Sequence, residues 1–166
     1  MNLDRVAIGV ARDLKEVVFV GAFAVICHVG PYRSSQDINI ALATPLGDNE
    51  FEALGYRIFH ESGKKVIRTP EGVKLDVYTR DVSGIMVSDV FRTAITKRIR
   101  RNEVRVMGLE ALLIAKMRAS RPQDIEDLHE LCRQLGKTVK WNVVNELATP
   151  EESAELKNVV LFMLSG

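Results

Sequence analysis

The chain has few of the residues that mark zinc-binding, disulfide-rich or membrane-spanning proteins. Its two cysteines, Cys27 and Cys132, lie in apolar helical contexts without metal-ligand spacing, so we expect buried, reduced thiols. The three histidines, His28, His60 and His129, are also scattered without ligand spacing. No apolar run approaches the roughly 18 to 20 residues of a membrane span. These absences give no support for a zinc centre or a membrane anchor.

The sequence also carries almost no net charge. It has 23 Lys and Arg against 22 Asp and Glu, a formal net charge of +1. A protein this close to neutrality has no global basic field for nucleic acid, so any contact with a polyanion must be local. The N-terminus does not have the shape of a signal peptide. We therefore expect a cytoplasmic protein that makes no membrane contact.

Length and composition fit a single globular domain spanning residues 1–166. The chain is 46% apolar and 27% charged, which is ordinary for a soluble protein with one core. Alternating and apolar patterns predict strands near residues 17–20, 37–43, 56–61, 64–69 and 73–79, and residues 103–107 can form a further strand. Helical patterns predict helices at residues 2–13, 49–55 and 108–119, from 122 and at 141–147. A last helix is expected from 149, where Thr149-Pro150-Glu151-Glu152 is a capping-box signal. The expected fold is α/β (α+β), with a small mixed sheet in residues 1–107 and a helical part in residues 108–166.

Residues 17–43 carry the clearest chemical pattern. Gly21 follows a buried apolar run and opens a short apolar helix, where backbone N–H groups can attract phosphate. On the next predicted strand Asp37 and Asn39 share one face, while their apolar neighbours point into the core. Mg²⁺ is commonly bound by one or two carboxylates together with substrate phosphates. The two features together predict a nucleoside triphosphate site.

These residues resemble the minimal nucleotidyltransferases, the superfamily that includes DNA polymerase beta. The similar residues are Gly21-Ala22-Phe23-Ala24 and then Arg33-x-Ser35-x-Asp37-Ile38-Asn39. A second block is similar to the branch of toxins resembling the AbiEii protein of phage abortive infection, namely Leu109-Glu110, Lys116 and Arg121-x-x-Asp124-x-x-Asp127-Leu128. The resemblance implies a nucleotidyltransferase-like fold and transfer of a nucleoside monophosphate from an NTP to an acceptor.

The resemblance also implies roles for particular residues. The implied catalytic residues are Asp37, Asp76 and Lys116. The implied nucleotide-binding residues are Gly21, Ala22, Arg33, Ser35 and Lys116. The implied ligands of Mg²⁺ or Mn²⁺ are Asp37, Asn39 and Asp76.

Two positions depart from the family pattern. Ala22 stands where the family has Gly or Ser, and Asn39 stands where it has a second metal-binding Asp. An amide carbonyl can bind Mg²⁺ but brings no negative charge. A catalytically impaired nucleotide-binding or interaction protein that keeps the fold is therefore an alternative to an active enzyme.

Asp76 and Lys116 each have a structural alternative as well. Asp76 lies on a predicted strand whose other face is aliphatic, so it either serves the site or is an exposed Asp beside Lys74. Lys116 falls on the apolar stripe of its helix, where a buried ammonium requires an anionic partner. Alternatively, its side chain extends to solvent along the edge of the stripe.

Asp124 and Asp127 lie one turn apart on the inward side of the helix that starts at Pro122. The helix dipole would explain an acid at the first turn, which accounts for Asp124 better than for Asp127. Arg121 and the two acids could instead form an ion-pair network that orients Lys116. We favour this supporting role over direct catalysis.

The remaining expectations concern partners. An RNA, protein or small-molecule acceptor and an antitoxin partner follow from the resemblance, and the apolar stripe of the last helix could serve a homodimer.

Residues 83–96 fit either a helix or irregular structure. The basic run 97–101, which we expect to be unstructured, is either a solvated face or a contact with phosphate or RNA.

Overall fold

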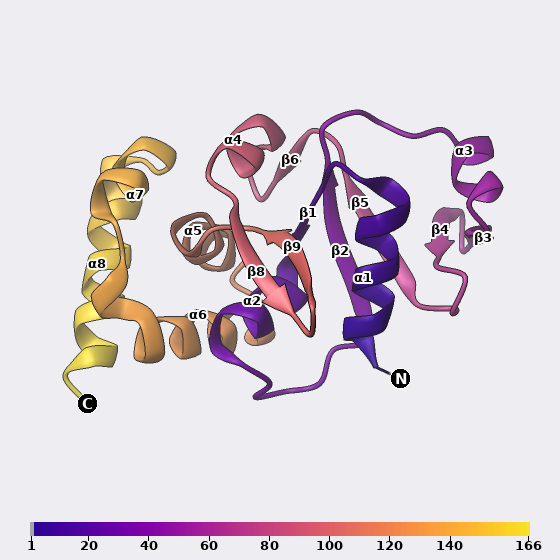
Figure 1. The fold of residues 1–166 in the computed structure, drawn as a ribbon. Helices are drawn as coiled ribbons and strands as arrows, with labels where there is room; N and C mark the ends of the chain where they lie inside the picture. The colour runs from indigo at the N-terminus through magenta and orange to yellow at the C-terminus, as the bar shows by residue number, and fades with distance from the viewer. Residues whose placement is uncertain (1) are drawn as a thin grey trace.

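The computed structural model describes residues 2–166, which form a mixed β-sheet with helices packed around it (Figure 1). The strands of the main sheet are β1 (Val17–Val20), β2 (Asp37–Leu42), β3 (Arg57–Glu61), β4 (Lys64–Arg68), β5 (Lys74–Tyr78), β8 (Ile95–Ile99) and β9 (Asn102–Val106). Their order is β3-β4-β5-β2-β1-β9-β8. The pairs β2/β5 and β1/β9 are parallel, and the other neighbours are antiparallel. The five strands predicted from the sequence are all confirmed.

Helices account for most of the chain after residue 108, as predicted. The helices are α1 (Leu3–Leu14), α2 (Gly21–Val29), α3 (Asp48–Ala53), α4 (Val87–Arg92), α5 (Leu109–Ala119), α6 (Pro122–Leu135), α7 (Trp141–Leu147) and α8 (Pro150–Leu164). In Figure 1 the β3–β4 hairpin and the helices α7 and α8 lie at opposite ends of the molecule. Across the part of the chain that the structure describes, no helix combines the length and the apolar character that crossing a bilayer requires.

Capping interactions explain where the two longest helices begin. Helix α6 starts at Pro122, and the Asp124 carboxylate accepts a hydrogen bond from the backbone N–H of Arg121 at 3.2 Å. Helix α8 follows Thr149, whose hydroxyl accepts from the N–H of Glu152 while the Glu152 carboxylate accepts from the N–H of Thr149. This reciprocal pair is the capping box that the sequence predicts.

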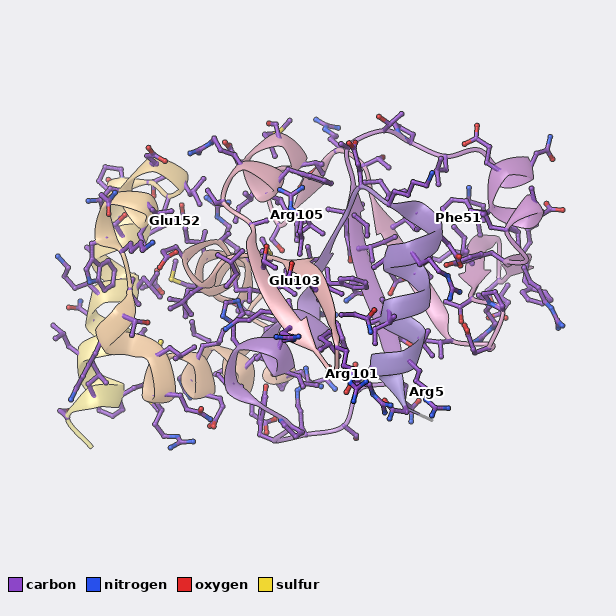
Figure 2. All side chains as sticks on the ribbon, in the orientation of Figure 1. Arg5, Phe51, Arg101, Glu103, Arg105 and Glu152 are labelled. Atoms are coloured by element: carbon purple, nitrogen blue, oxygen red, sulfur yellow. The ribbon has the colours of Figure 1, made fainter. Side chains whose placement is uncertain are left out.

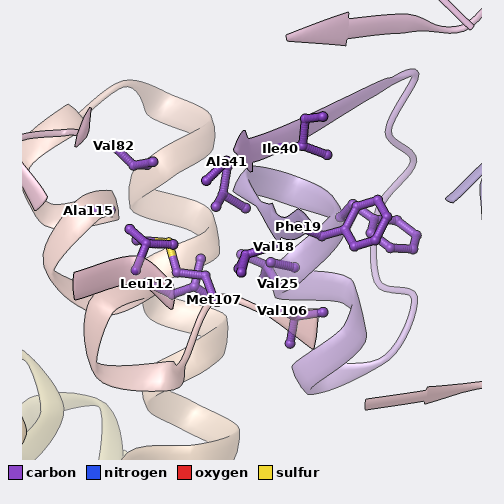
Figure 3. Packing of buried hydrophobic residues seen from close by; sticks show 14 of the residues in the cluster. Val18, Phe19, Val25, Ile40, Ala41, Val82, Val106, Met107, Leu112 and Ala115 are labelled. Atoms are coloured by element: carbon purple, nitrogen blue, oxygen red, sulfur yellow. The ribbon is translucent and has the colours of Figure 1, made fainter. Parts of the chain in front are cut away.

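The core lies between the central strands and helices α1, α2 and α5. All four residues of β1 are buried, because this strand sits inside the sheet and is covered by helices. Figure 3 shows part of the cluster, to which β1 contributes Phe19, β2 contributes Ile40 and α5 contributes Leu112. Because the apolar faces of β2 and β5 are anchored in this core, the polar residues between them are held on the other face.

The two cysteines are partly or fully buried and carry no disulfide. Burial raises the pKa of Cys132 to about 11 and is the main cause that raises the pKa of Cys27 to about 12. Both thiols are therefore protonated and unreactive at neutral pH.

His28 binds the backbone carbonyl of Met107 at 2.8 Å, a structural contact between α2 and the end of β9.

The region from residue 81 to residue 106 is more regular than the sequence suggests. It contains a small two-stranded sheet of β6 (Asp81–Val82) and β7 (Ile85–Met86), then α4, then the β8–β9 hairpin. The expectation of an unstructured basic run at residues 97–101 is wrong, because these residues complete β8 and form the hairpin turn, in which Arg100 has a φ of 56°. Figure 2 labels Arg101 and Arg105 at the two ends of β9. Binding of phosphate or RNA by this run stays a prediction.

Candidate functional site

Four polar residues lie on one face of the sheet where β2 pairs with β5. In the parallel register Asp37 is opposite Lys74, and Asn39 is opposite Asp76. Residues in register on neighbouring strands point to the same face, as do residues two apart on one strand. We call Asp37, Asn39, Lys74 and Asp76 the β2–β5 quartet. The residues between them are aliphatic and buried, so the quartet has a rigid support.

The quartet opens into a pocket with a volume of about 470 Å³. Nine of the eleven site residues proposed from the sequence line it; Gly21 and Asp127 lie just outside its lining. The lining includes five residues that the sequence analysis did not propose: Ser34, Gln36, Lys74, Tyr78 and Gln123. The chain therefore brings nine sequence-predicted residues from α2, β2, β5, α5, α6 and the loops that precede β2 and α6 to one place.

Gly21 and Asn39 meet at the end of β1. Gly21 has a φ of +65°, and a Cβ atom built on it would lie 2.3 Å from Nδ2 of Asn39. Only glycine allows this approach without movement. The Oδ1 atom of Asn39 is buried and has no hydrogen-bond partner among residues 2–166. A buried acceptor without a partner is unusual in a folded protein, and this oxygen is free to accept from a donor or a cation outside the chain.

Within the quartet, Lys74 lies closest to Asp76. The Nζ atom of Lys74 is 3.7 Å from Oδ1 of Asp76, and the two side chains are 41% and 37% exposed. Burial raises the pKa of Asp76, the nearby Asp37 carboxylate adds to the rise, and Lys74 opposes it. A half-exposed pair at this distance is weak, so the ammonium can move away from Asp76.

The residues of the quartet fit a hard divalent cation. Within residues 2–166 no three Asp, Glu, His or Cys side chains are grouped to hold a metal ion. Mg²⁺ nevertheless takes one or two carboxylates when substrate phosphates supply further oxygens. Asp37 and Asp76 are two such carboxylates, and Asn39 offers its unpaired Oδ1. This set of oxygens suits Mg²⁺ or Mn²⁺ bound together with a triphosphate.

Lys116 lies on the inner side of α5 between two acids from α6. Its Nζ is 3.0 Å from Oδ1 of Asp124 and 2.8 Å from Oδ2 of Asp127. The Lys116 side chain is 8% exposed, so it does not extend to solvent. Burial lowers the pKa of Lys116, whereas Asp124 acts against the decrease. Two carboxylates supply the anionic partners that a buried ammonium requires.

Asp127 also ties α6 to the loop that precedes β2. Arg33 donates from Nε to Oδ1 at 2.8 Å and from Nη2 to Oδ2 at 2.9 Å, and the Tyr32 hydroxyl also donates to Oδ1. Burial by itself raises the pKa of Asp127, to about 7. The guanidinium of Arg33 and the ammonium of Lys116 act in the opposite direction, so we assign Asp127 as a carboxylate.

Arg121 completes this network at the mouth of the pocket. Its Nε donates to Oδ2 of Asp124 at 2.7 Å, while 74% of its side chain stays exposed. Burial of Asp124 opposes ionisation, but the hydrogen bonds from Arg121 and Lys116 prevail and lower the pKa of this carboxyl. The ion-pair network that the sequence suggested around Lys116 is present. It links α5, α6 and the loop of Arg33.

Two further residues of the motif lie at the pocket wall. Ser35 donates from Oγ to the backbone carbonyl of Asp37 at 3.3 Å, so its hydroxyl supports the start of β2. Ala22 lines the pocket in the first turn of α2. Tyr32, which the sequence analysis missed, stands beside Arg33 in a loop without periodicity, and its role depends on a partner 95 positions along the chain.

Solved structures with the same fold are nucleotidyltransferase-like. An antigenic nucleotidyltransferase-like protein from Paracoccidioides brasiliensis has 18% sequence identity and a TM-score of 0.55, covering 93% of this chain and 92% of its own. The antibiotic-resistance factor ANT(2'')-Ia has 15% identity and a TM-score of 0.58, with 99% and 95% covered. Its complex with adenylyl-2''-tobramycin has 17% identity and a TM-score of 0.54, with 96% and 94% covered.

At these identities the structural similarity shows the fold alone, and it confirms the nucleotidyltransferase-like architecture predicted from the sequence. A comparison with curated proteins finds no match. The AbiEii-like branch stays a prediction. Residues 13–158, most of the chain, match the model of a family described as "Nucleotidyl transferase of unknown function (DUF2204)". The chain therefore belongs to this nucleotidyl transferase family.

Proposed function

We propose that this chain is a divalent-metal-dependent nucleotidyltransferase that moves a nucleoside monophosphate from an NTP to an acceptor hydroxyl. One observation carries the proposal. Asp37, Asn39 and Asp76 share one face of two paired strands, beside the helix start at Gly21 and over a pocket of about 470 Å³. A nucleoside triphosphate needs cation ligands and phosphate-binding N–H groups close together, and this arrangement offers both.

Each residue would contribute through its position. Asp37 and Asp76, with Oδ1 of Asn39, would hold Mg²⁺ or Mn²⁺, which when bound neutralises triphosphate charge. The N–H groups in the first turn of α2, at Gly21 and Ala22, would bind phosphate oxygens. Asp76 either accepts the proton of the attacking hydroxyl or shares the cation with Asp37. Its raised pKa makes it a better proton acceptor than an ordinary carboxylate.

The network around Lys116 would supply positive charge and rigidity. Lys116 and Arg121 both line the pocket, and Arg121 is exposed enough to reach a phosphate oxygen. Arg33 was proposed from the sequence as a nucleotide-binding residue. Its two bonds to Asp127 favour a different role, in which it holds the loop before β2 in place.

The acceptor is the least constrained part of the proposal. ANT(2'')-Ia has been crystallised with adenylyl-2''-tobramycin, so that protein holds a nucleotidylated antibiotic. For this chain we propose a hydroxyl on an RNA, a protein or a small molecule, and we extend the proposal to a toxin with an antitoxin partner. Growth arrest on expression of the wild type, absent with Asp37→Asn, would support the toxin role. Unimpaired growth would count against it.

A second candidate is a nucleotide-binding protein that has lost catalysis. Neutral Asn39 and the presence of Lys74 in the quartet favour it, because both reduce the negative charge available to a cation. This candidate predicts nucleotide binding that does not depend on Mg²⁺. The enzyme predicts binding that does.

The experiment incubates the protein with each α-³²P-labelled NTP, with Mg²⁺ or Mn²⁺, and with RNA and protein extracts. We expect at least one NTP to label an acceptor in the wild type and in Lys64→Met, an exposed lysine of β4. Asp37→Asn should remove the label. Absence of label with every NTP, or label that survives Asp37→Asn, would contradict the proposal.

A further inference from the structure

Asp37, Asn39 and Asp76 would bind a cation through their oxygen atoms, and this role does not require the ammonium of Lys74 beside them. Lys74 lies opposite Asp37 in the register and two residues before Asp76 on the same strand. Its Nζ is 3.7 Å from Oδ1 of Asp76, and it lines the same pocket. An ammonium therefore sits among the groups that would hold a divalent cation.

The charge of the quartet limits how many cations it can hold. Two-metal sites place two divalent ions about 3.5 to 4 Å apart, and anionic ligands must offset their repulsion. Here two carboxylates, one neutral amide and one ammonium leave a single net negative charge. Among residues 2–166 no third acid is grouped with these two carboxylates to hold a metal, and Asp124, which lines the same pocket, is paired with Lys116 and Arg121. A second divalent ion would face repulsion from the first ion and from Lys74 without a further carboxylate to offset it.

We propose that the Lys74 ammonium takes the place of one divalent cation, so that the site binds a single Mg²⁺ or Mn²⁺ together with the nucleotide. The proposal rests on the proposed function and specifies the cation content of the same site. The neutral Asn39 and the ammonium of Lys74 together change the charge by two relative to three carboxylates, which is the charge of one divalent ion. Both residues shift the charge of the quartet in the same direction, so together they supply the positive charge that a second divalent ion would bring.

The geometry also allows Lys74 to bind the triphosphate once a nucleotide is present. A lysine ammonium is a compact charge on a flexible stem, and the pair with Asp76 is half-exposed and long. When a cation binds Asp76, the ammonium is released from its carboxylate partner. It can then turn to an oxygen of the triphosphate within the same pocket.

The test counts bound Mn²⁺ from the electron paramagnetic resonance signal of the free ion, with and without a non-hydrolysable NTP analogue. We expect one Mn²⁺ per wild-type chain in both cases. Lys74→Met should bind this Mn²⁺ about tenfold more tightly without nucleotide, because a like charge is removed. Lys74→Arg, which keeps the charge, should not show this gain in affinity, and the exposed control Lys64→Met should leave the affinity unchanged.

The double variant Lys74→Met with Asn39→Asp gives the decisive comparison. The double variant removes the ammonium and adds a third carboxylate. It should therefore bind two Mn²⁺ when the NTP analogue is present. Thermal melting confirms that each variant is folded, and Lys74→Gln replaces Lys74→Met if the latter is not. Two Mn²⁺ in the wild type, no Mn²⁺ at all, or an unchanged count in the double variant would overturn the proposal.

The same data separate this proposal from the proposed function. One Mn²⁺ bound together with the NTP analogue, but no transfer from any NTP to an acceptor, would contradict the proposed function and support the cation count. Two Mn²⁺ bound with the analogue in the wild type would contradict the cation count and leave the transferase standing.

Discussion

The Asn39 side chain packs directly on the bare Cα of Gly21, so closely that a Cβ there would lie 2.3 Å from Nδ2. This contact couples the turn at the end of β1, which we propose binds phosphate, to the quartet on β2. It also explains why the turn needs glycine for two separate reasons, the φ of +65° and the close approach.

Gly21→Ala should destabilise the protein by about 2 to 4 kcal/mol, since backbone strain and a clash add together. Gly63→Ala is the matched control, because Gly63 has a φ of +77° but nothing within 4 Å of the added Cβ. It should cost only about 1 kcal/mol. Urea unfolding measures both, and Asn39→Ala in the Gly21→Ala background should recover part of the loss. Equal losses at the two glycines would show that the contact with Asn39 is unimportant.

Asp127→Asn should destabilise the protein by about 3 to 5 kcal/mol, because Lys116 and Arg33 lose their shared carboxylate inside the protein. The control is Asp48→Asn, which breaks the exposed ion pair with Lys65 and should cost about 0 to 1 kcal/mol. Chemical denaturation compares the two free energies of unfolding. Similar small losses would mean that the buried network contributes little to the fold.

Stability should fall on acidification below about pH 4, the ordinary range of Asp and Glu in unfolded chains. The pKa of Asp124 is lowered by Arg121 and Lys116 against the effect of burial, and that of Glu152 is lowered to about 2, chiefly by Arg118. Acids with a folded-state pKa below the unfolded value stabilise the fold at higher pH and lose that contribution as pH falls through the folded pKa.

The measurement is urea unfolding at a series of pH values between 2 and 7. Asp124→Asn and Glu152→Gln should each reduce the slope of stability against pH in the acid range. The pair should reduce it further, since the two residues have no shared partner. A wild type with flat stability down to pH 2 would contradict this assignment.

Asn39→Asp should make stability depend on Mg²⁺. Without the ion, a third carboxylate beside Asp37 and Asp76 should cost about 1 to 2 kcal/mol near neutral pH. With Mg²⁺ the new carboxylate gains a cation, so the loss should be recovered. Thermal melts of wild type and variant, each with and without Mg²⁺, test this. A variant that melts like the wild type in both buffers would place residue 39 outside any cation site.

Residue patterns along the chain predicted which faces the site residues take, because alternation on a strand depends on local geometry alone. Asp37, Asn39 and Asp76 follow this rule, and so does the inward position of Lys116 on its helix. Pro122 and the capping box at Thr149 likewise marked helix starts correctly, since caps are local hydrogen bonds.

What the sequence could not supply is the pairing of distant segments. That β2 lies beside β5 in a register matching Asn39 with Asp76, and Asp37 with Lys74, depends on contacts nearly 40 residues apart. From the sequence, Lys74 therefore looked like a neighbour that weakened the case for Asp76. Strand β8 was missed because its outer face is polar and basic, as suits an edge strand.

The central claim is that the quartet and the turn at Gly21 bind a nucleoside triphosphate through a divalent cation. Isothermal titration calorimetry with a non-hydrolysable NTP analogue tests it most directly, on the wild type, Asp37→Asn and the control Lys64→Met, each with Mg²⁺ and with EDTA. The account predicts binding by wild type and control that requires Mg²⁺, and at least about a tenfold loss of affinity in Asp37→Asn. Binding that is equal in EDTA, or unchanged by Asp37→Asn, would contradict it.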